Sequence, residues 1–214
     1  MEARVRPYTE EDLPSMTAIW NRVVMDGEAF PQQDPVADDE SSDFFGSFDF
    51  CGVAEADGRI VGMYEIRPNN VGRCGHIANA SYAVDPDCRG MHVGRALVED
   101  SLSRAASLGY RIMQFNAVVK ENSNARHLYE ELGFNLVGEI PGGFRHRDGT
   151  YHGICIYYRG LRCRPQVLQV PGEGVPCWYC YLHRRMRVHG VRRQGGGSGA
   201  VLGRAADRRG LRPR

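Results

Sequence analysis

The sequence predicts a mixed α/β domain, with a central β-sheet flanked by helices, followed by a segment of different character. Short strand-like segments alternate with helical ones up to about residue 160, as in mixed α/β folds. Beyond it the charge changes abruptly: residues 162–214 carry twelve Arg, no Lys and two acidic residues, a net charge of +10, whereas the whole 214-residue chain carries +1. We therefore divide the chain into a domain over residues 1–160 and an Arg/Gly-rich extension over residues 161–214, which we expect to be disordered.

The composition indicates a packed, water-soluble domain. Hydrophobic residues make up 42% of the chain and charged residues 25%, and no run approaches the roughly 20 apolar residues of a membrane span. The charged first residues do not resemble a signal peptide. The seven cysteines, an odd number without a framework spacing, indicate reduced thiols. We expect a cytoplasmic protein without a membrane partner.

The first half of the domain is expected to contain a strand, a helix and a hairpin. Residues 3–8 alternate as in a strand, and Thr9 can cap the helix that follows, whose apolar residues between 13 and 24 have helical spacing. Residues 27–42 are rich in Pro and Asp and predict a loop or short helices that could rim a site. Residues 51–56 and 59–67 predict two strands joined at Asp57-Gly58.

The second half is expected to follow the order strand, helix, strand, helix, strand, strand. The strands are residues 76–84, 111–119, 135–140 and 151–158, and the last two are joined through residues 141–143 and 148–149. One helix runs from Gly94 to Leu108 and ends at Gly109. The other begins at Asn122, has its apolar residues at helical spacing, and stops at Gly133.

The segment between the strand 76–84 and the next helix has the features of a phosphate-binding loop. The first amides of a helix lack intrahelical acceptors, and together with the helix dipole they attract anions. Gly90 and Gly94 permit a close approach to the backbone, while Arg89 and Arg95 add positive charge. The same features also fit an ordinary strand-to-helix turn with solvated arginines.

Two motifs resemble signatures of the GNAT-family N-acetyltransferases. Residues 89–94, Arg-Gly-Met-His-Val-Gly, resemble the Arg/Gln-x-x-Gly-x-Gly/Ala signature, and residues 122–134 resemble the helix N-x-x-A-x-x-L-Y-E-x-L-G-F. The resemblance covers about residues 3–160 and implies the GNAT acyl-CoA N-acyltransferase fold, with acetyl-CoA as co-substrate and no metal. His92 departs from the pattern, since most members have Gly there.

The resemblance also implies which residues contact acetyl-CoA. The loop amides would hold its pyrophosphate, and the strand ending at Val84 would splay open, pair with the pantetheine arm and donate an amide to the oxyanion. The implied contacts are Tyr82, Ala83, Val84, Arg89, Gly90, Met91, His92, Val93, Gly94, Arg95, Asn122 and Ala125.

Tyr129 is the candidate proton donor to the departing thiolate. A phenol has a pKa of about 10, close to that of an alkanethiol, and the family's tyrosine occupies this helix position. From spacing alone, packing of Tyr129 on the apolar face of the helix is the favoured interpretation, and only the resemblance to the family motif reverses this.

Asn79 and Asn116 are candidate substrate contacts, because amides both donate and accept hydrogen bonds. Their segments resemble those of fungal acetyltransferases that act on proline analogues, in which matching asparagines contact the substrate. A buried amide pair without a substrate role is the alternative. The general base is left open among Glu65, Glu28, His76 and a water chain.

The extension permits several interpretations. Its Cys177, Cys180, His183 and His189 are metal-ligand types, but their spacing fits no standard zinc finger. Its Arg clusters could contact nucleic acid non-specifically. Its abrupt composition would also fit translation in a wrong reading frame.

The function that these observations favour is acetyl transfer from acetyl-CoA to the amine of a small molecule, such as an amino acid or an analogue, by direct attack in a ternary complex. A protein N-terminal or Lys acetyltransferase is the enzymatic alternative, and a CoA-binding or nucleic-acid-binding regulator is the non-enzymatic one. A homodimer is an open option, since dimers are common in the family.

Overall fold

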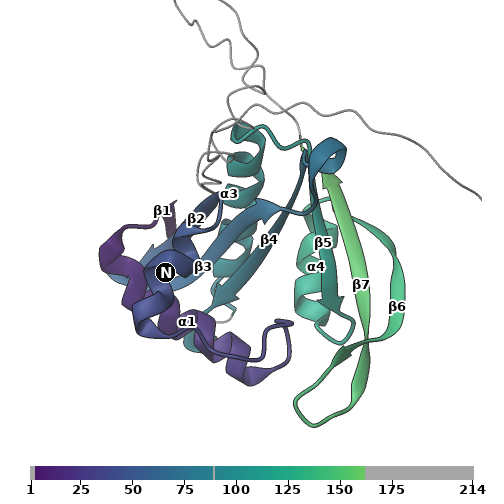
Figure 1. Ribbon diagram of the computed structural model, residues 1–214, viewed down its shortest axis with the longest axis horizontal. Helices are drawn as coiled ribbons and strands as arrows, with labels where there is room; N and C mark the ends of the chain where they lie inside the picture. The colour runs from purple at the N-terminus through teal and green to yellow at the C-terminus, as the bar shows by residue number, and fades with distance from the viewer. Residues whose placement is uncertain (1–2, 89, 162–214) are drawn as a thin grey trace, which may run out of the picture. The chain divides into compact units, whose positions relative to one another are not determined.

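The computed structural model describes residues 3–88 and 90–161, so the expectations for Arg89 and for the extension beyond Leu161 lie outside the described residues. Within them, seven strands form a sheet in the order β1-β2-β3-β4-β5-β7-β6 (Figure 1). The strands are β1 (Arg4–Pro7), β2 (Phe50–Ala56), β3 (Arg59–Pro68), β4 (Ile77–Val84), β5 (Ile112–Val119), β6 (Asn135–Arg145) and β7 (Tyr151–Gly160).

The described residues contain four α-helices. They are α1 (Leu13–Asp26), α2 (Ser41–Gly46), α3 (Val93–Ser107) and α4 (Ser123–Glu131). The Thr9 amide donates to Asp12 Oδ2 at 2.7 Å just before α1, and α1 ends at Gly27, which has a φ of 69°. Each α-helix in the described part of the chain is too short or too polar to cross a membrane.

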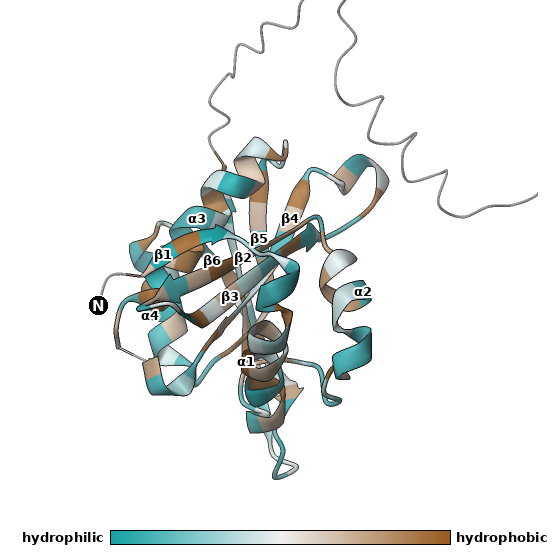
Figure 2. Cartoon of the chain, turned by 90° about the vertical axis from the view of Figure 1, so that its left-hand side faces the viewer, coloured by the Kyte–Doolittle hydropathy of each residue, from teal (hydrophilic) through white to brown (hydrophobic). Residues whose placement is uncertain are grey.

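The two faces of the sheet carry separate cores. Leu97, Val98 and Leu102 of α3 pack on one face, together with Leu128 and Tyr129 of α4. The other face is covered by α1 and α2, whose Met16, Trp20 and Phe45 are almost fully buried. Figure 2 shows these helices on opposite sides of the sheet. Because strand side chains alternate between faces, each position on β4 and β5 points to one core or the other.

The sheet opens between β4 and β5. These strands are parallel, and in the described residues their pairing consists of Ile77 with Ile112 and Ala78 with Met113. On its other edge, β4 pairs with β3 along its whole length, from Ala78 to Val84. The two strands then diverge, as Figure 1 shows, so the β4 backbone beyond Ala78 has one edge without a neighbouring strand.

The predicted order of elements is confirmed, with one correction at residues 141–143. These residues were expected to connect two strands, but they lie inside β6, where the register with β7 shifts between Ile140 and Phe144. A Cβ on Gly143 would lie 2.5 Å from Ile154 Cγ1, so Gly permits a β-bulge here, close to β7. The turn itself lies further on, where the His146 amide donates to the Thr150 carbonyl at 2.8 Å.

Candidate active site

The start of α3 is open to an anion. His92 is the N-cap residue, with φ 59° and ψ 11°, and its side chain makes no capping hydrogen bond. The amides of Val93, Gly94 and Arg95 therefore have no acceptor within the helix. At Gly90, with φ 81°, no described atom lies within 4 Å of the point that a Cβ would occupy, so the backbone is accessible there. We call the segment from Gly90 to Arg95 the α3 cradle; its Met91 is 40% exposed.

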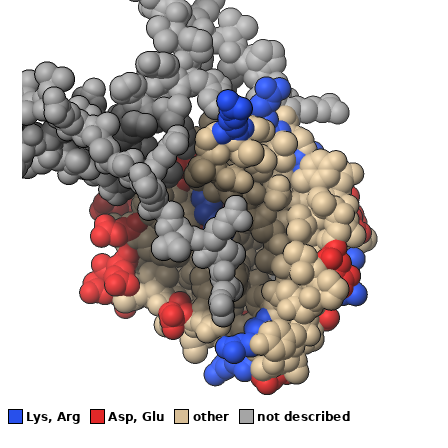
Figure 3. Space-filling view, turned by 45° about the vertical axis from the view of Figure 1, so that its right-hand side comes forward, with Lys and Arg blue, Asp and Glu red and all other residues tan. Residues whose placement is uncertain are grey.

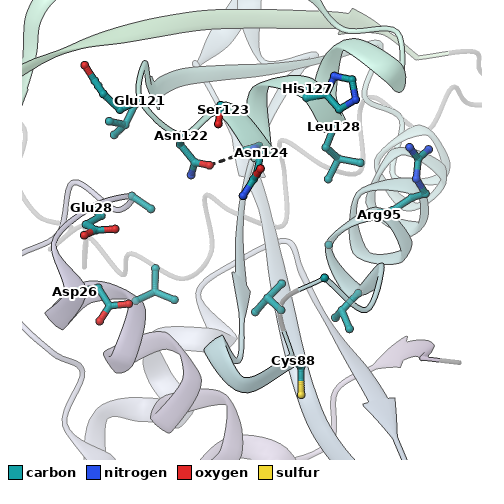
Figure 4. A pocket seen from close by; sticks show the side chains of 18 of the residues that line it. Asp26, Glu28, Cys88, Arg95, Glu121, Asn122, Ser123, Asn124, His127 and Leu128 are labelled. Carbon is teal, nitrogen blue, oxygen red and sulfur yellow. Dashed lines mark hydrogen bonds between the residues drawn. The ribbon is translucent and has the colours of Figure 1, made fainter. Parts of the chain in front are cut away.

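A cavity of about 900 Å³ lies beside the α3 cradle. Gly94 and Leu128 contribute to its wall from the α3/α4 face of the sheet, while Val23, Asp26 and Glu28 contribute from the end of α1 on the other face. In Figure 4, Asp26 and Glu28 lie across the cavity from the first turn of α4. The cavity therefore connects the two faces of the sheet beside the gap between β4 and β5.

Two of the expected cofactor-contacting side chains have partners in the protein. Arg95 is ion-paired with Glu131 and lies 3.7 Å from Glu99, so two carboxylates already contact its guanidinium. The Asn122 Oδ1 accepts a hydrogen bond from the Ala125 amide at 3.1 Å, which confirms Asn122 as the cap of α4. Asn122, Ala125 and Arg95 all line the cavity (Figure 4).

The end of β4 lies beside the cavity and has one edge without a neighbouring strand. The Tyr82 hydroxyl lies 2.7 Å from Ser101 Oγ of α3, Ala83 is completely buried, and Val84 lines the cavity. The strand edge at these residues has no neighbour, because the pairing with β5 ends at Ala78. An uncapped helix start, a cavity of this size and an open strand edge together fit a ligand with a pyrophosphate and an extended arm.

Tyr129 lies in an aromatic group on the α3/α4 face and does not line the cavity. Its ring centroid is 4.6 Å from that of Phe115, 5.6 Å from Phe134 and 6.4 Å from Tyr82. Burial raises the pKa of Tyr129, so the phenol keeps its proton at neutral pH. The structure gives Tyr129 a packing role, and its proton transfer stays a prediction.

Asn79 and Asn116 are brought together by a residue that the sequence analysis did not identify. Asn69 Oδ1 accepts hydrogen bonds from Asn79 Nδ2, at 3.2 Å, and from Asn116 Nδ2. The Asn116 Oδ1 in turn accepts from Gln114 Nε2 at 2.9 Å. We call these four side chains the amide cluster. Asn79 is 8% exposed, whereas Asn116 is exposed, so the two do not form the buried pair that was the alternative.

The amide cluster lies on the face of the sheet that α1 and α2 cover. Asn79 is four residues before Ala83, which belongs to the core of that face, while Ala78 and Ala80 belong to the opposite core. Figure 3 shows a hollowed surface in which uncharged groups predominate, with acidic side chains along one side of its rim.

The three candidate bases are in different places. Glu28 is exposed and lines the cavity. Glu65 is completely buried and is ion-paired with Arg67, away from the cavity wall. His76 precedes β4 at the end of the strand farthest from the α3 cradle, and its carbonyl accepts from the Arg111 amide at 2.9 Å.

His146, which was not a candidate in the sequence analysis, lines the cavity from the β6–β7 turn. Its Nε2 is buried and has no hydrogen-bond partner among the described residues. Its ring lies 4.0 Å from the ring of His152, whose Nδ1 is 3.0 Å from Glu121 Oε1. This hydrogen bond from His152 lowers the pKa of Glu121. His146 and His152 flank the predicted Asp148-Gly149 turn. Because residues on facing strands of a hairpin contact each other, this spacing could have predicted the contact between the two rings.

The acetyltransferase (GNAT) family matches residues 13–134, which contain the α3 cradle and α4. The N-acetyltransferase aca1 of Schizosaccharomyces pombe is 31% identical over 155 residues, covering 64% of this chain and 73% of aca1. A solved GCN5-related N-acetyltransferase from Kribbella flavida is 32% identical, covers 74% of this chain and 98% of its own, and superposes with a TM-score of 0.69.

A phosphinothricin acetyltransferase from Sinorhizobium meliloti, solved in complex with AcCoA, shares the fold, with a TM-score of 0.71 at 23% identity over 83% of this chain and 97% of that one. The family match, the similarity to aca1 and the open α3 cradle lead to the same assignment. This chain belongs to the acetyltransferase (GNAT) family and is an acetyl-CoA-dependent N-acetyltransferase.

Proposed function

We propose that the protein acetylates the amine of a small molecule, an amino acid or an analogue, by direct attack while both substrates are bound. The observation that carries this proposal is the cavity lined from both faces of the sheet beside the gap between β4 and β5. One substrate can enter from the α3 cradle and the other from the face that holds the amide cluster. Holding both reactants at one opening removes much of the entropic barrier to transfer.

The α3 cradle would hold the pyrophosphate of acetyl-CoA through backbone amides, since helix starts bind anions in this way. The open edge of β4 at Tyr82, Ala83 and Val84 would pair with the pantetheine arm, and an amide there would stabilise negative charge on the thioester oxygen. Asn79 and Asn116 would contact the acceptor from the other face.

Two proton transfers accompany the reaction. The attacking amine must lose a proton, and His146 is our candidate to accept it, because its Nε2 is buried on the cavity wall without a described partner. The departing thiolate must gain a proton, for which Tyr129 remains the candidate, since its raised pKa keeps the phenol protonated.

A contact beside the end of α1 favours a small acceptor over a polypeptide. Arg147 Nη1 donates to the Met25 carbonyl at 3.1 Å, which joins the β6–β7 turn to the end of α1. Arg147 Cβ lies 3.2 Å from the position of a Cβ on Gly27, so the two segments are in close contact. A peptide substrate would need an open groove along this side.

The acceptor class can be tested by measuring thiol release from acetyl-CoA with a panel of acceptors. We expect free amino acids or their analogues to be acetylated, with N-acetylated products confirmed by mass spectrometry. Peptides with a free N-terminus or an internal Lys are expected to react at least about 10-fold more slowly in kcat/KM. Preferential acetylation of peptides would contradict the proposal.

The role of His146 can be tested with His146→Gln, using His76→Gln as the matched control. We expect His146→Gln to lose about 100-fold in kcat and to lose the acidic limb of the pH–rate profile, as for a missing general base. The control lies at the far end of β4 and should keep full activity. Equal activity of the two variants would remove His146 from the mechanism.

A further inference from the structure

We propose that Asn69 is a positioning residue that orients the amide cluster so that the enzyme selects acceptors with a carboxylate next to the amine. This inference rests on the proposed function and specifies its substrate class. Three hydrogen bonds link the side chains of Asn69, Asn79, Asn116 and Gln114 in one chain.

A backbone hydrogen bond to the neighbouring strand fixes the position of Asn69. Its amide donates to the Ile77 carbonyl at 2.8 Å, which continues the β3–β4 pairing by one residue. Its side-chain oxygen accepts from amides on two different strands, β4 and β5, on either side of the gap. Asn69 therefore sets which atom each neighbouring amide presents to the acceptor.

These hydrogen bonds leave the amide cluster with more free donors than free acceptors. The Asn69 oxygen is taken by two donors and the Asn116 oxygen by Gln114, while the Asn69 Nδ2 hydrogens have no acceptor among the described residues. An Asn side chain offers two N–H groups and one oxygen, so Asn79 and Asn116 each retain one N–H. Such a surface is complementary to an anion.

Arg67 adds positive charge at the same place. It pairs directly with Asn79 in the β3–β4 register, and its Nη1 lies 3.3 Å from Ser81 Oγ. Glu65 contacts the guanidinium, yet 34% of the Arg67 side chain remains exposed. Guanidinium and amide N–H groups together match the two oxygens of a carboxylate.

The position of Asn79 in the sheet indicates where the amine of the acceptor would bind. Asn79 is the first residue of β4 beyond the last pair with β5, so it stands where the sheet opens. Its Oδ1 accepts no hydrogen bond from the described residues, and of the two such oxygens in the amide cluster, the other being Gln114 Oε1, it is the one on β4. An amine N–H bound to this oxygen, with the carboxylate on Arg67 and Asn69, describes an α-amino acid or a close analogue.

The test compares each amino acid with its carboxamide, which keeps the amine and replaces the carboxylate by a neutral group of the same shape. For the unmodified enzyme we expect kcat/KM to favour the amino acid by at least about 10-fold. Asn69→Ala should raise KM for the amino acid about 10-fold while kcat and KM for acetyl-CoA stay nearly unchanged. Asn69→Asp should reverse the preference, because it places a negative charge against the carboxylate.

The matched control is Asn70→Asp, which adds the same charge one residue further on, at an exposed position whose side chain contacts the Val71 amide. It should leave the preference unchanged, and a thermal unfolding scan of each variant reports any loss of fold. Asn69 variants that slow the amino acid and its carboxamide equally would overturn this inference while leaving the proposed function intact. If the unmodified enzyme acetylates no small amine, the proposed function fails and this inference with it.

Discussion

At the scale of single residues, His92 is the position where the sequence departs from the family signature. The backbone conformation at this position explains why the signature has Gly there. Its φ of 59° is left-handed, a conformation that Gly adopts without a steric penalty and other residues adopt at a cost of roughly 1–2 kcal/mol. The family's Gly thus suits a backbone requirement, and His92 meets the same requirement less easily.

We expect His92→Gly to bind acetyl-CoA as tightly as the unmodified protein. Its free energy of unfolding should change by no more than about 1 kcal/mol, because relief of the left-handed strain is offset by the greater freedom of Gly in the unfolded chain. Calorimetric titration and thermal unfolding measure the two quantities. A tenfold weaker affinity would show that the imidazole itself contacts the phosphates.

Tyr129→Phe separates chemistry from packing, since it keeps the ring among Phe115, Phe134 and Tyr82 and removes the hydroxyl. We expect kcat to fall about 100-fold with unchanged affinity for acetyl-CoA, as for the loss of a general acid. Steady-state kinetics on the folded variant provide the measurement. If kcat stays within about threefold, Tyr129 serves packing alone.

At the scale of elements, the start of α3 can be tested through Gly94. A Cβ there would meet only Leu128 Cδ2, at 3.7 Å, among the described residues, so the fold has room for a side chain. Gly94→Asp should nevertheless abolish binding of acetyl-CoA, because it places a negative charge among the amides expected to hold the pyrophosphate. Calorimetry with acetyl-CoA tests this.

Gly46→Asp is the control for Gly94→Asp. It adds the same side chain at the exposed end of α2, where a Cβ has nothing within 4 Å. We expect it to bind acetyl-CoA normally. Unchanged binding by a folded Gly94→Asp variant would exclude the α3 cradle as the phosphate site.

The start of α1 is tied to β1 by an ion pair whose strength depends on pH. Arg6 Nη1 lies 2.7 Å from Asp12 Oδ2, and this hydrogen bond lowers the pKa of Asp12 to about 2. A carboxyl with a lowered pKa stabilises the fold above its unfolded pKa of about 3.9, and the contribution is lost as the pH falls through the folded value.

Asp12→Asn should therefore lower the free energy of unfolding by about 2 kcal/mol at pH 7, which corresponds to a loss of about 4–8 °C in Tm. Near pH 2 the variant and the unmodified protein should converge. Asp57→Asn, in the exposed β2–β3 turn, is the control and should have little effect at either pH. A Tm difference that does not vary with pH would mean that Asp12 acts through packing.

The elements themselves were largely predictable, because local signals determine them. Asn122 and Gly133 mark the two ends of α4 through their side-chain and backbone chemistry, and the structure places them as expected. Thr9 instead precedes the 3-10 turn Glu10–Asp12, and the N-cap residue of α1 is Asp12. Residues 141–143 have the composition of a turn, but pairing with β7 keeps them in β6. The conformation of that segment is determined by a tertiary contact, which a local sequence pattern cannot predict.

The parts of the candidate site that lie in one contiguous motif were predictable. The parts that depend on which residues face each other in neighbouring strands were not. The α3 cradle lies within one segment and could be identified from residues 89–95. Asn69 acts through neighbours on β4 and β5, so its role depends on which residues face each other across three strands. His146 reaches the cavity because the β6–β7 turn contacts the end of α1 through Arg147, and the sequence contains no sign of that contact.

At the scale of the whole molecule, Leu161 is the last described residue and still makes contacts with the domain. The Leu161 amide donates to the Arg111 carbonyl at 2.8 Å, and its side chain packs against the main core. We therefore expect a protein that ends at Leu161 to keep its Tm and its thiol-release activity. It would carry a net charge of −9, because residues 162–214 contribute +10 to the total of +1.

Thermal unfolding and the thiol-release assay on the two proteins test this expectation. Non-specific, salt-sensitive binding to nucleic acid by the full chain should disappear with residues 162–214. A Tm lower by about 10 °C would correspond to several kcal/mol of lost stability. Such a loss, or insolubility of the shortened protein, would place part of the fold beyond Leu161.

Because β4 and β5 diverge, aromatic rings, and not backbone hydrogen bonds, make the contact between these two strands beyond Ala78. Hydrogen bonds hold neighbouring strands at one fixed spacing, but past Ala78 that spacing no longer applies to this pair. There Phe115 of β5 meets Tyr82 of β4 edge-on, with ring centroids 5.8 Å apart, and stacks on Phe134 at 4.6 Å. Ring sizes can change through single substitutions, so a substitution at Phe115 or Phe134 can alter the spacing of the two strands from within the core.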